Sequence, residues 1–191
     1  MPNYRRRRIA GGTYFFTVVT ENRRPFLCTD LARQILRDAI ADCGRDRPFD
    51  AVAMVLLPDH LHAIWTLPNG DADYSGRWAR IKAQFTREWL QHGGEEQDQD
   101  FSRLRHRRRG VWQRKFWEHH IRDERDFEKH FDYVHYNPVK HELAKCSHDY
   151  AYSTFGKWMK RSVYEAAWCC GCGGRIAKPP SFEGLDMTAM E

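Results

Sequence analysis

Two histidines separated by one residue, His60 and His62, form the pattern in this sequence that most directly suggests chemistry. Side chains two positions apart on a β-strand point to the same face, so both imidazoles would converge on one point while Leu61 faces away. Imidazole is a common metal ligand at neutral pH. The alternative is two histidines without a shared function, because the chain has ten. The pair alone does not decide between these interpretations.

A tyrosine and an asparagine, Tyr133 and Asn137, lie four residues apart in a segment with helical periodicity. They therefore lie on one side of the helix, about one turn apart. Both fall off the apolar stripe of this segment, so Tyr133 is not expected to be needed for the core. Pro138 disfavours helical geometry at Asn137, whose amide is expected to project from a fraying end. The alternative is a tyrosine packed at the helix flank and an asparagine that terminates the helix.

Basic residues are clustered along the chain. Its 31 Lys and Arg exceed its 26 Asp and Glu and give a net charge of +5, and Arg residues are concentrated at 5–8 and 103–109. Clustered Arg interleaved with aromatic residues, which make up 14% of the chain, suits a polyanion whose bases can stack. An ordinary solvated surface would show the same excess of charge.

The expected secondary structure indicates an α+β fold. Strands are predicted at 13–20, 50–57, 60–67 and 111–121, and helices from Thr29 or Asp30 to Cys43, at 74–90 and at 123–138. The first six elements match a ferredoxin-like split βαβ arrangement, an antiparallel sheet with helices on one face. We expect one domain over residues 1–158, with a mobile acidic and then basic insertion at about 91–110. Residues 159–191 are expected to form a partly ordered C-terminal extension.

The six cysteines suggest no obvious metal site. Cys169, Cys170 and Cys172 are clustered and contain one C-x-x-C, but no second pair follows at zinc-ribbon spacing, so zinc is the less favoured interpretation. Cys146 and the other two are scattered and look like ordinary small residues. The N-terminus lacks the apolar stretch of a secretory signal, and no run approaches the ~18 to 20 apolar residues of a membrane span. We therefore expect a cytoplasmic protein that does not contact membranes and has reduced thiols.

Three separated blocks resemble the REP-associated tyrosine transposases, which are domesticated relatives of the single-tyrosine HUH transposases (His, hydrophobic residue, His). The blocks are Pro-Asp-His-Leu-His at 58–62, Trp-Gln-Arg-Lys-Phe-Trp-Glu-His at 112–119 and Asp-Tyr-Val-His-Tyr-Asn-Pro-Val-Lys-His at 132–141. Shorter matches extend the resemblance over most of residues 4–158. The insertion and the Cys-containing tail depart from the family pattern, which puts the DNA contacts in doubt but leaves the proposed site intact.

The resemblance implies a ferredoxin-like fold with a specific set of site residues. It implies His60 and His62 as metal ligands, Asn137 as the third ligand and Tyr133 as the nucleophile. It also implies single-stranded or hairpin DNA as substrate, with the repetitive extragenic palindromes called REP as the class. Mixed nitrogen and oxygen ligation suits Mg²⁺ or Mn²⁺ better than a closed zinc site.

The implied activity is strand transfer, because a phosphotyrosine intermediate conserves the cut bond for rejoining. Two alternatives are a hairpin-binding regulator that does not cut and a metal-dependent nuclease that uses water. The oligomeric state, monomer or dimer, stays open. The residues expected to contact DNA are Arg5, Arg6, Arg7, Arg8, Arg77, Arg80, Lys82, Arg114 and Lys115, together with the Arg run at 103–109.

Overall fold

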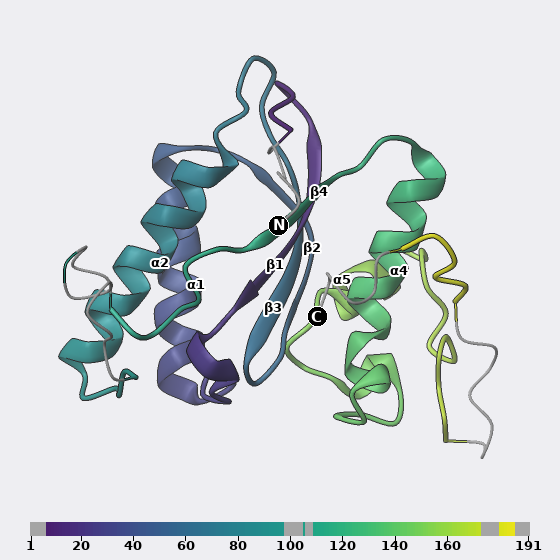
Figure 1. Cartoon of the computed structure of the whole chain (residues 1–191). Helices are drawn as coiled ribbons and strands as arrows, with labels where there is room; N and C mark the ends of the chain where they lie inside the picture. Colours follow the sequence, from purple (N-terminus) through teal and green to yellow (C-terminus); the bar gives the residue numbers. More distant parts are fainter. Residues whose placement is uncertain (1–6, 98–104, 106–108, 173–179, 186–191) are drawn as a thin grey trace.

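The computed structural model of the chain describes residues 7–97, 105, 109–172 and 180–185. Within these residues, four strands form one antiparallel sheet, and helices pack against both of its faces (Figure 1). The strands are β1 (Thr13–Val19), β2 (Asp50–Leu56), β3 (His60–Thr66) and β4 (Trp117–His120). The helices are α1 (Asp30–Asp46), α2 (Tyr74–Gln91), α4 (Glu124–Lys140) and α5 (Phe155–Met159), with 3-10 turns η1 (Glu21–Arg23) and η2 (Ser147–Asp149).

The sheet has the order β2-β3-β1-β4, and every neighbouring pair is antiparallel. This arrangement, with a helix between β1 and β2 and another between β3 and β4, confirms the expected α+β fold of the ferredoxin-like type. The two helices of that pattern, α1 and α2, lie together on one face as expected. The later helices α4 and α5 lie on the opposite face, so the sheet is covered on both sides (Figure 1).

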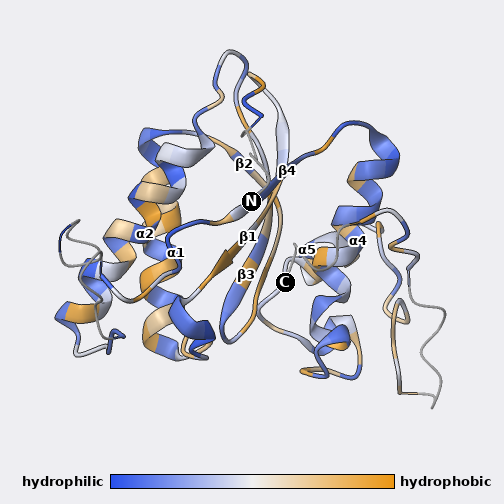
Figure 2. Ribbon diagram, viewed as in Figure 1, coloured by the Kyte–Doolittle hydropathy of each residue, from blue (hydrophilic) through white to orange (hydrophobic). Residues whose placement is uncertain are grey.

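Strand alternation divides the core into two layers. Tyr14 and Phe16 of β1 pack with α1 and α2, whereas Phe15 between them packs with α4. Both layers exclude water, which explains why β1 is an almost continuous apolar run rather than an alternating one. The helices mix hydrophilic and hydrophobic residues along their length, as expected for helices with one buried side (Figure 2).

Side-chain caps begin the three long helices. Thr29 accepts a hydrogen bond from the backbone N–H of Ala32 at the start of α1, and Asp123 accepts one from Asp126 at the start of α4. Both caps were expected from the sequence. Such caps satisfy N–H groups that have no partner within the helix.

Two predicted helix ends were wrong. Helix α1 continues through Gly44 to Asp46, which keeps Cys43 in the core. Helix α4 continues through Pro138 to Lys140. Pro138 and Val139 are both buried there, and their packing outweighs the one hydrogen bond that proline cannot donate.

The strand predicted over 111–121 is also shorter than expected. Trp112 makes an isolated bridge to Thr20, whereas regular pairing begins only where Trp117 lies opposite Thr17. The segment from Trp112 to Trp117 has two more residues than the facing stretch of β1, so it cannot stay in register and bends out of the sheet. Arg114 lies in this bend and is exposed.

Among the described residues, no helix combines the length and the apolar character needed to cross a membrane.

Candidate active site

The two histidines of β3 face helix α4. Their ring centroids lie 4.9 Å apart, and His60 and His62 expose only 2% and 0% of their surfaces. Leu61 points to the other layer of the core, with α1 and α2. The expected same-face arrangement is therefore present, and the two rings meet inside the protein rather than on its surface.

Each imidazole is oriented through its Nδ1 atom. His60 Nδ1 lies 2.6 Å from Oδ1 of Asp59, and His62 Nδ1 lies 2.9 Å from Oγ1 of Thr17, its register partner on β1. A carboxylate can only accept, so Nδ1 of His60 must carry the proton. Both Nε2 atoms are buried and have no hydrogen-bond partner among the described residues. This is the arrangement of metal-binding histidines, whose second nitrogen is fixed by an outer partner.

The pKa values of Asp59 and His62 favour the protonation states that metal binding requires, an ionised carboxylate and a neutral imidazole. Burial would raise the pKa of Asp59, but the hydrogen bond from His60 and the Arg23 guanidinium at 2.8 Å outweigh it and hold this pKa at about 2. Burial lowers the pKa of His62 well below its usual value, and nearby positive groups lower it further. His62 is therefore neutral at pH 7, with a lone pair on Nε2 if Nδ1 carries the proton.

Helix α4 places Tyr133 and Asn137 over this part of the sheet. The Tyr133 ring centroid lies 5.2 Å from that of His62 and 5.9 Å from that of Phe15. Both α4 residues are fully buried, so the expectations of a tyrosine outside the core and an asparagine at a fraying end were wrong. Local periodicity placed Tyr133 off the apolar stripe of α4. The face of the sheet that carries His60 and His62 covers this flank of the helix as well, which is why Tyr133 is buried.

The Asn137 side chain leaves its oxygen available. Its Nδ2 donates to the backbone carbonyl of Tyr133 at 3.4 Å, whereas its buried Oδ1 has no partner among the described residues. Two imidazole nitrogens and one amide oxygen are thus desolvated without hydrogen bonds, which normally costs about 1–3 kcal/mol for each group. A divalent cation would satisfy all three, so these residues fit the metal that the family implies.

Charged groups also surround the Tyr133 hydroxyl. Burial raises the pKa of Tyr133, and the Asn137 side chain and the charge of Arg23 oppose that shift. Lys140, one turn beyond Asn137 on α4, places Nζ 3.5 Å from the hydroxyl oxygen. A cation at this distance stabilises the phenolate relative to the phenol.

Four neighbours of the site were not identified from the sequence: Thr17, Asp59, Lys140 and His141. Asp59 precedes His60 directly, and this adjacency was the available signal. Lys140 and His141 follow Asn137 within about one turn, and the His141 ring centroid lies 5.5 Å from that of His60. Thr17 lies 45 residues from His62, and only the strand pairing brings them together.

A second histidine cluster lies near the start of α4. His119, Asp126 and His130 are close enough to hold a metal ion, but Asp126 Oδ2 already accepts from His119 at 2.8 Å and from Arg122 at 3.0 Å. These bonds join β4 to the first turn of α4. His119 is thus held in a structural contact. His135, further along α4, is held in the same way by hydrogen bonds with Thr154 and Tyr164.

A segment near the C-terminus covers the nucleophile candidate. The Phe182 ring centroid lies 5.4 Å from that of Tyr133 and 5.7 Å from that of Tyr136. Because Tyr133 has no exposed surface, DNA can reach its hydroxyl only if the residues around it move.

The basic residues predicted to contact DNA differ in their surroundings. Arg77 is 1% exposed, and its guanidinium donates to Asp71 and to the carbonyls of Arg47, Pro48 and Asp73. It therefore fixes α2 against neighbouring loops, and its expected place on a free basic face was wrong. A buried charge needs such partners, and these hydrogen bonds already occupy the guanidinium. Arg77 is therefore unavailable to phosphate.

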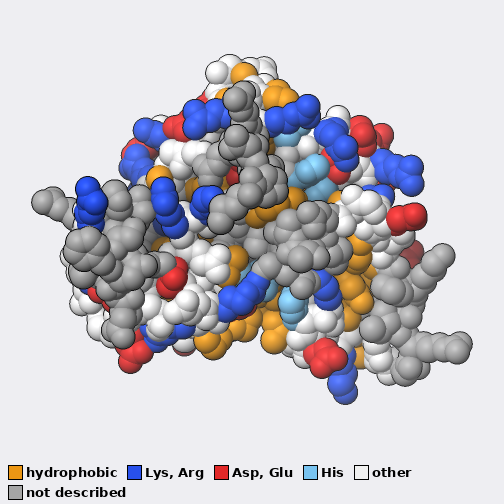
Figure 3. Space-filling model, viewed as in Figure 1, with side chains coloured by type: hydrophobic (Ala, Val, Ile, Leu, Met, Phe, Trp, Pro, Cys, Tyr) orange, Lys and Arg blue, Asp and Glu red, His pale blue; other side chains and the backbone are white. Residues whose placement is uncertain are grey.

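The other predicted contacts keep exposed or partly exposed surface. Arg7, Arg8, Arg80, Arg114 and Lys115 are exposed and Lys82 is half-buried. Arg80 pairs with Asp46, and Lys82 donates to the carbonyl of Gln113. In the Arg run, Arg105 is exposed and Arg109 pairs with Glu96, while Arg5, Arg6, Arg103, Arg107 and Arg108 lie outside the described residues. Figure 3 shows the described Lys and Arg side chains at many separate points on one face.

Comparisons with known proteins identify the family of this chain. The chain is 44% identical over 168 residues to a REP-associated tyrosine transposase of Escherichia coli (strain K12), covering 88% of this chain and 91% of the relative. It is 40% identical over 168 residues to a Haemophilus influenzae protein of the same family name, covering 88% of this chain and 93% of that protein. No protein-family model matches the chain.

A solved structure shows the same architecture. A REP-associated tyrosine transposase bound to a REP hairpin superposes with a TM-score of 0.75 at 40% identity, covering 97% of this chain and 96% of that one. The chain thus belongs to the REP-associated tyrosine transposases, a family of enzymes.

Proposed function

We propose that this chain cleaves and rejoins single strands of REP-type hairpin DNA through a covalent bond to Tyr133. The observation that carries the proposal is the position of the Tyr133 ring, 5.2 Å from the ring of His62, which itself lies 4.9 Å from the ring of His60. Among the described residues, the Nε2 atoms of both histidines and the amide oxygen of Asn137 are buried without a hydrogen-bond partner. A protein that only bound hairpins would gain nothing from burying these groups unsatisfied.

The proposed step exchanges one phosphate ester for another. The Tyr133 oxygen attacks phosphorus, an oxygen–phosphorus bond to tyrosine forms, and the bond to one strand oxygen breaks and leaves that strand with a hydroxyl. The phenolic proton passes to solvent water, and the departing strand oxygen takes up a proton from water in its place. Lys140 stabilises the negative charge that develops on the tyrosine oxygen. Reversal with another strand's hydroxyl rejoins DNA without an external energy source.

A divalent cation, Mg²⁺ or Mn²⁺, held by His60, His62 and Asn137 would place positive charge on the non-bridging oxygens of the scissile phosphate. The chain's own residues prepare for this role. Asp59 and Thr17 fix both imidazoles, and burial of the site strengthens every electrostatic interaction within it. We propose Mg²⁺ or Mn²⁺ over zinc because the donor set includes an amide oxygen and leaves positions open.

The substrate class rests on the solved relative, which is bound to a REP hairpin. We propose that this chain contacts the backbone of a similar hairpin through Arg7, Arg8, Arg80, Arg114 and Lys115, which retain exposed side chains. Action on chromosomal palindromes would place the protein in the cytoplasm, at the nucleoid.

The decisive experiment mixes an end-labelled hairpin with Mg²⁺ or Mn²⁺ and the wild-type chain, Tyr133→Phe or Tyr136→Phe. Tyr136 is the matched control because it lies three residues on in α4 and also contacts Phe182. We expect label that stays on the protein in denaturant with wild type and Tyr136→Phe, and none with Tyr133→Phe. Adducts that persist in Tyr133→Phe would assign the nucleophile elsewhere.

The same experiment separates the two alternatives. Cleavage by wild type without any adduct would indicate a nuclease that uses water. Tight hairpin binding with neither cleavage nor adduct, at any metal concentration, would indicate a regulator that binds without cutting.

A further inference from the structure

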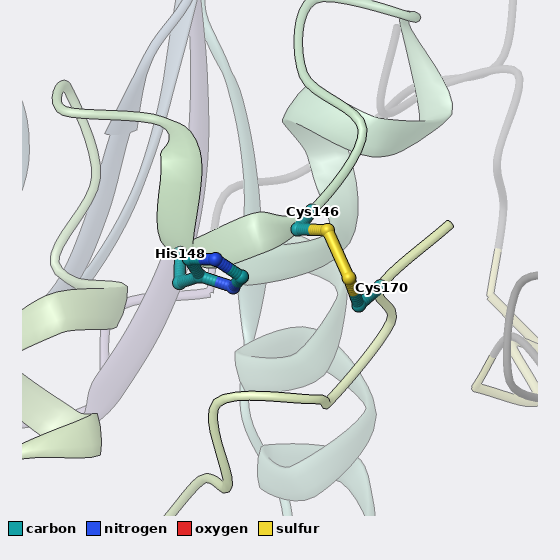
Figure 4. Close-up of side chains that lie close together, drawn as sticks. All are labelled: Cys146, His148 and Cys170. Carbon is teal, nitrogen blue, oxygen red and sulfur yellow. A yellow bond between two sulfur atoms is a disulfide. The ribbon is translucent and has the colours of Figure 1, made fainter. Parts of the chain in front are cut away.

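A further cluster of metal-ligating side chains, distinct from the two groups described above, lies near the C-terminal end of α4 and has no role in the proposed reaction. It contains Cys146, His148, Cys170 and Cys172. One donor atom from each of Cys146, His148 and Cys170 falls within 4.8 Å of the others (Figure 4). Cys172 completes the group, since its Sγ lies 3.0 Å from Sγ of Cys146.

The backbone brings two distant segments together at this cluster. Cys146 caps the short turn η2, which contains His148, whereas Cys170 and Cys172 belong to the C-terminal segment. The N–H of Gly171 donates to the carbonyl of Lys145 at 2.8 Å and joins the two segments beside the sulfur atoms. Each segment thus contributes two donors separated by one residue.

His148 is oriented as a metal ligand would be. Its Nδ1 lies 2.9 Å from the carbonyl oxygen of Ala166, which can only accept, so Nδ1 carries a proton. In the neutral ring Nε2 then has a lone pair, and it faces Oδ1 of Asp149 at 3.1 Å. Two acceptors facing each other at this distance require a cation, either a proton or a metal ion, near them.

Cys169 has a different role from its neighbours. It is buried beside α4, near the carboxylate of Asp132. Its thiol is part of the core, and none of the groups of donor atoms close enough to share an ion among the described residues includes it. The C-x-x-C pattern at 169–172 consequently misidentifies the pair, because the sulfur atoms that meet are those of Cys146, Cys170 and Cys172.

We propose that Cys146, His148, Cys170 and Cys172 bind one structural zinc ion. Three thiolates and one imidazole are a closed donor set typical of tetrahedral structural zinc. The structure joins Cys146 to Cys170 as a disulfide, which uses two of the three adjacent sulfur atoms. A zinc ion uses all three sulfur atoms and also accounts for the orientation of His148.

The zinc ion would attach the C-terminal segment to the turn that follows α4. Structural zinc contributes directly to folding free energy because the unfolded chain has no preformed site. Loss of the metal should therefore release the segment around Tyr164 and Cys169, whose side chains pack against α4.

The test measures metal content, with the full chain purified in a phosphine reductant that does not bind zinc. A His60→Ala/His62→Ala background removes the other candidate metal site. In that background we expect about one zinc ion per chain by elemental mass spectrometry. Cys172→Ser and His148→Asn should each lose most of it, and both residues are exposed, so the fold should tolerate them. Cys28→Ser, a half-buried thiol elsewhere, is the matched control and should keep the metal.

Cobalt substitution provides a second measurement. Cobalt bound by three thiolates should give sulfur-to-metal charge-transfer absorption and intense visible bands typical of tetrahedral coordination, and both should disappear in Cys172→Ser. Three results would overturn the proposal: zinc-free protein whose thiols all react, zinc that persists in both ligand variants, or a Cys146–Cys170 disulfide that forms with no metal bound under reductant.

Discussion

The carboxylate of Asp59 lies 2.6 Å from Nδ1 of His60, and this contact determines which nitrogen of the ring is available to a metal. Because Asp59 is ionised at pH 7, its oxygen can only accept, so Nδ1 donates the proton of this bond and Nε2 is the nitrogen that faces the proposed metal position. The same carboxylate binds Arg23 through its other oxygen. The residue before the first histidine is therefore a positioning residue for the proposed metal.

Asp59→Asn should weaken metal binding without removing a ligand. An amide carries no charge to hold the Nδ1 proton, and loss of such outer partners typically costs about 10- to 100-fold in affinity. We expect the Mn²⁺ concentration for half-maximal cleavage to rise by this factor, with activity recovered at high metal. Asp38→Asn on α1, whose carboxylate bonds Gln34 on the same helix, is the control and should leave the titration unchanged. An unchanged curve for Asp59→Asn would remove the positioning role.

His60→Ala and His62→Ala should each abolish cleavage while most hairpin affinity remains. Hairpin binding is expected to depend on surface arginines, whereas cleavage requires the two Nε2 atoms. His62 is fully buried, so thermal unfolding must show that the variants remain folded at the assay temperature. His92→Ala, at an exposed histidine near the end of α2, is the control. Wild-type cleavage that survives exhaustive chelation would contradict the metal site.

Lys140→Met should slow adduct formation and shift its pH profile upward. The lysine Nζ lies 3.5 Å from the Tyr133 oxygen, and removing this charge makes the phenolate harder to form. Single-turnover rates measured from pH 6 to 10 should therefore recover toward wild type at high pH. Lys145→Met, at an exposed lysine beyond α4, should match wild type throughout. A uniform loss of rate at every pH would indicate a merely structural role for Lys140.

Arg114→Gln and Lys115→Gln should reduce the salt dependence of hairpin binding. Both residues are exposed in the bend before β4, and each phosphate contact on a single strand contributes about 0.7 to the slope of log affinity against log salt. The double variant should lose up to about 1.4 of that slope if both residues contact phosphate. Lys160→Gln, exposed beyond α5 on the opposite side of the sheet from α2, should not change the slope. Equal slopes for the wild type, the double variant and Lys160→Gln would exclude Arg114 and Lys115 as phosphate contacts.

Acid should destabilise the fold partly through His135. Burial lowers its pKa from about 6.5 when unfolded to about 3 in the folded chain. Between those values only the unfolded state takes up the proton, so stability falls as pH decreases, by up to about 1.4 kcal/mol per pH unit. In urea unfolding, the free energy of unfolding of His135→Gln should fall less between pH 7 and pH 5 than that of the wild type. If the free energy of unfolding of the variant falls between these pH values by as much as that of the wild type, His135 is already protonated in the folded protein.

The sequence by itself determined the features that follow from local periodicity. Alternation along a strand puts His60 and His62 on one face whatever packs against it. The order of strands and helices likewise predicts the antiparallel sheet with α1 and α2 together. Caps such as Thr29 and Asp123 depend only on neighbouring residues, so they too were predictable.

Only the tertiary structure decided what covers each face. Tyr133 and Arg77 lie off the apolar stripes of their helices, yet both are buried, because periodicity identifies the faces of one element and not those of its neighbours. The bend at Arg114 arises because the segment from Trp112 to Trp117 has two more residues than the stretch of β1 that it faces. The sequence of the segment alone does not show which residues of β1 lie opposite it. Cys146 meets Cys170 and Cys172 for the same reason: chain segments far apart in sequence become neighbours only when both pack around α4.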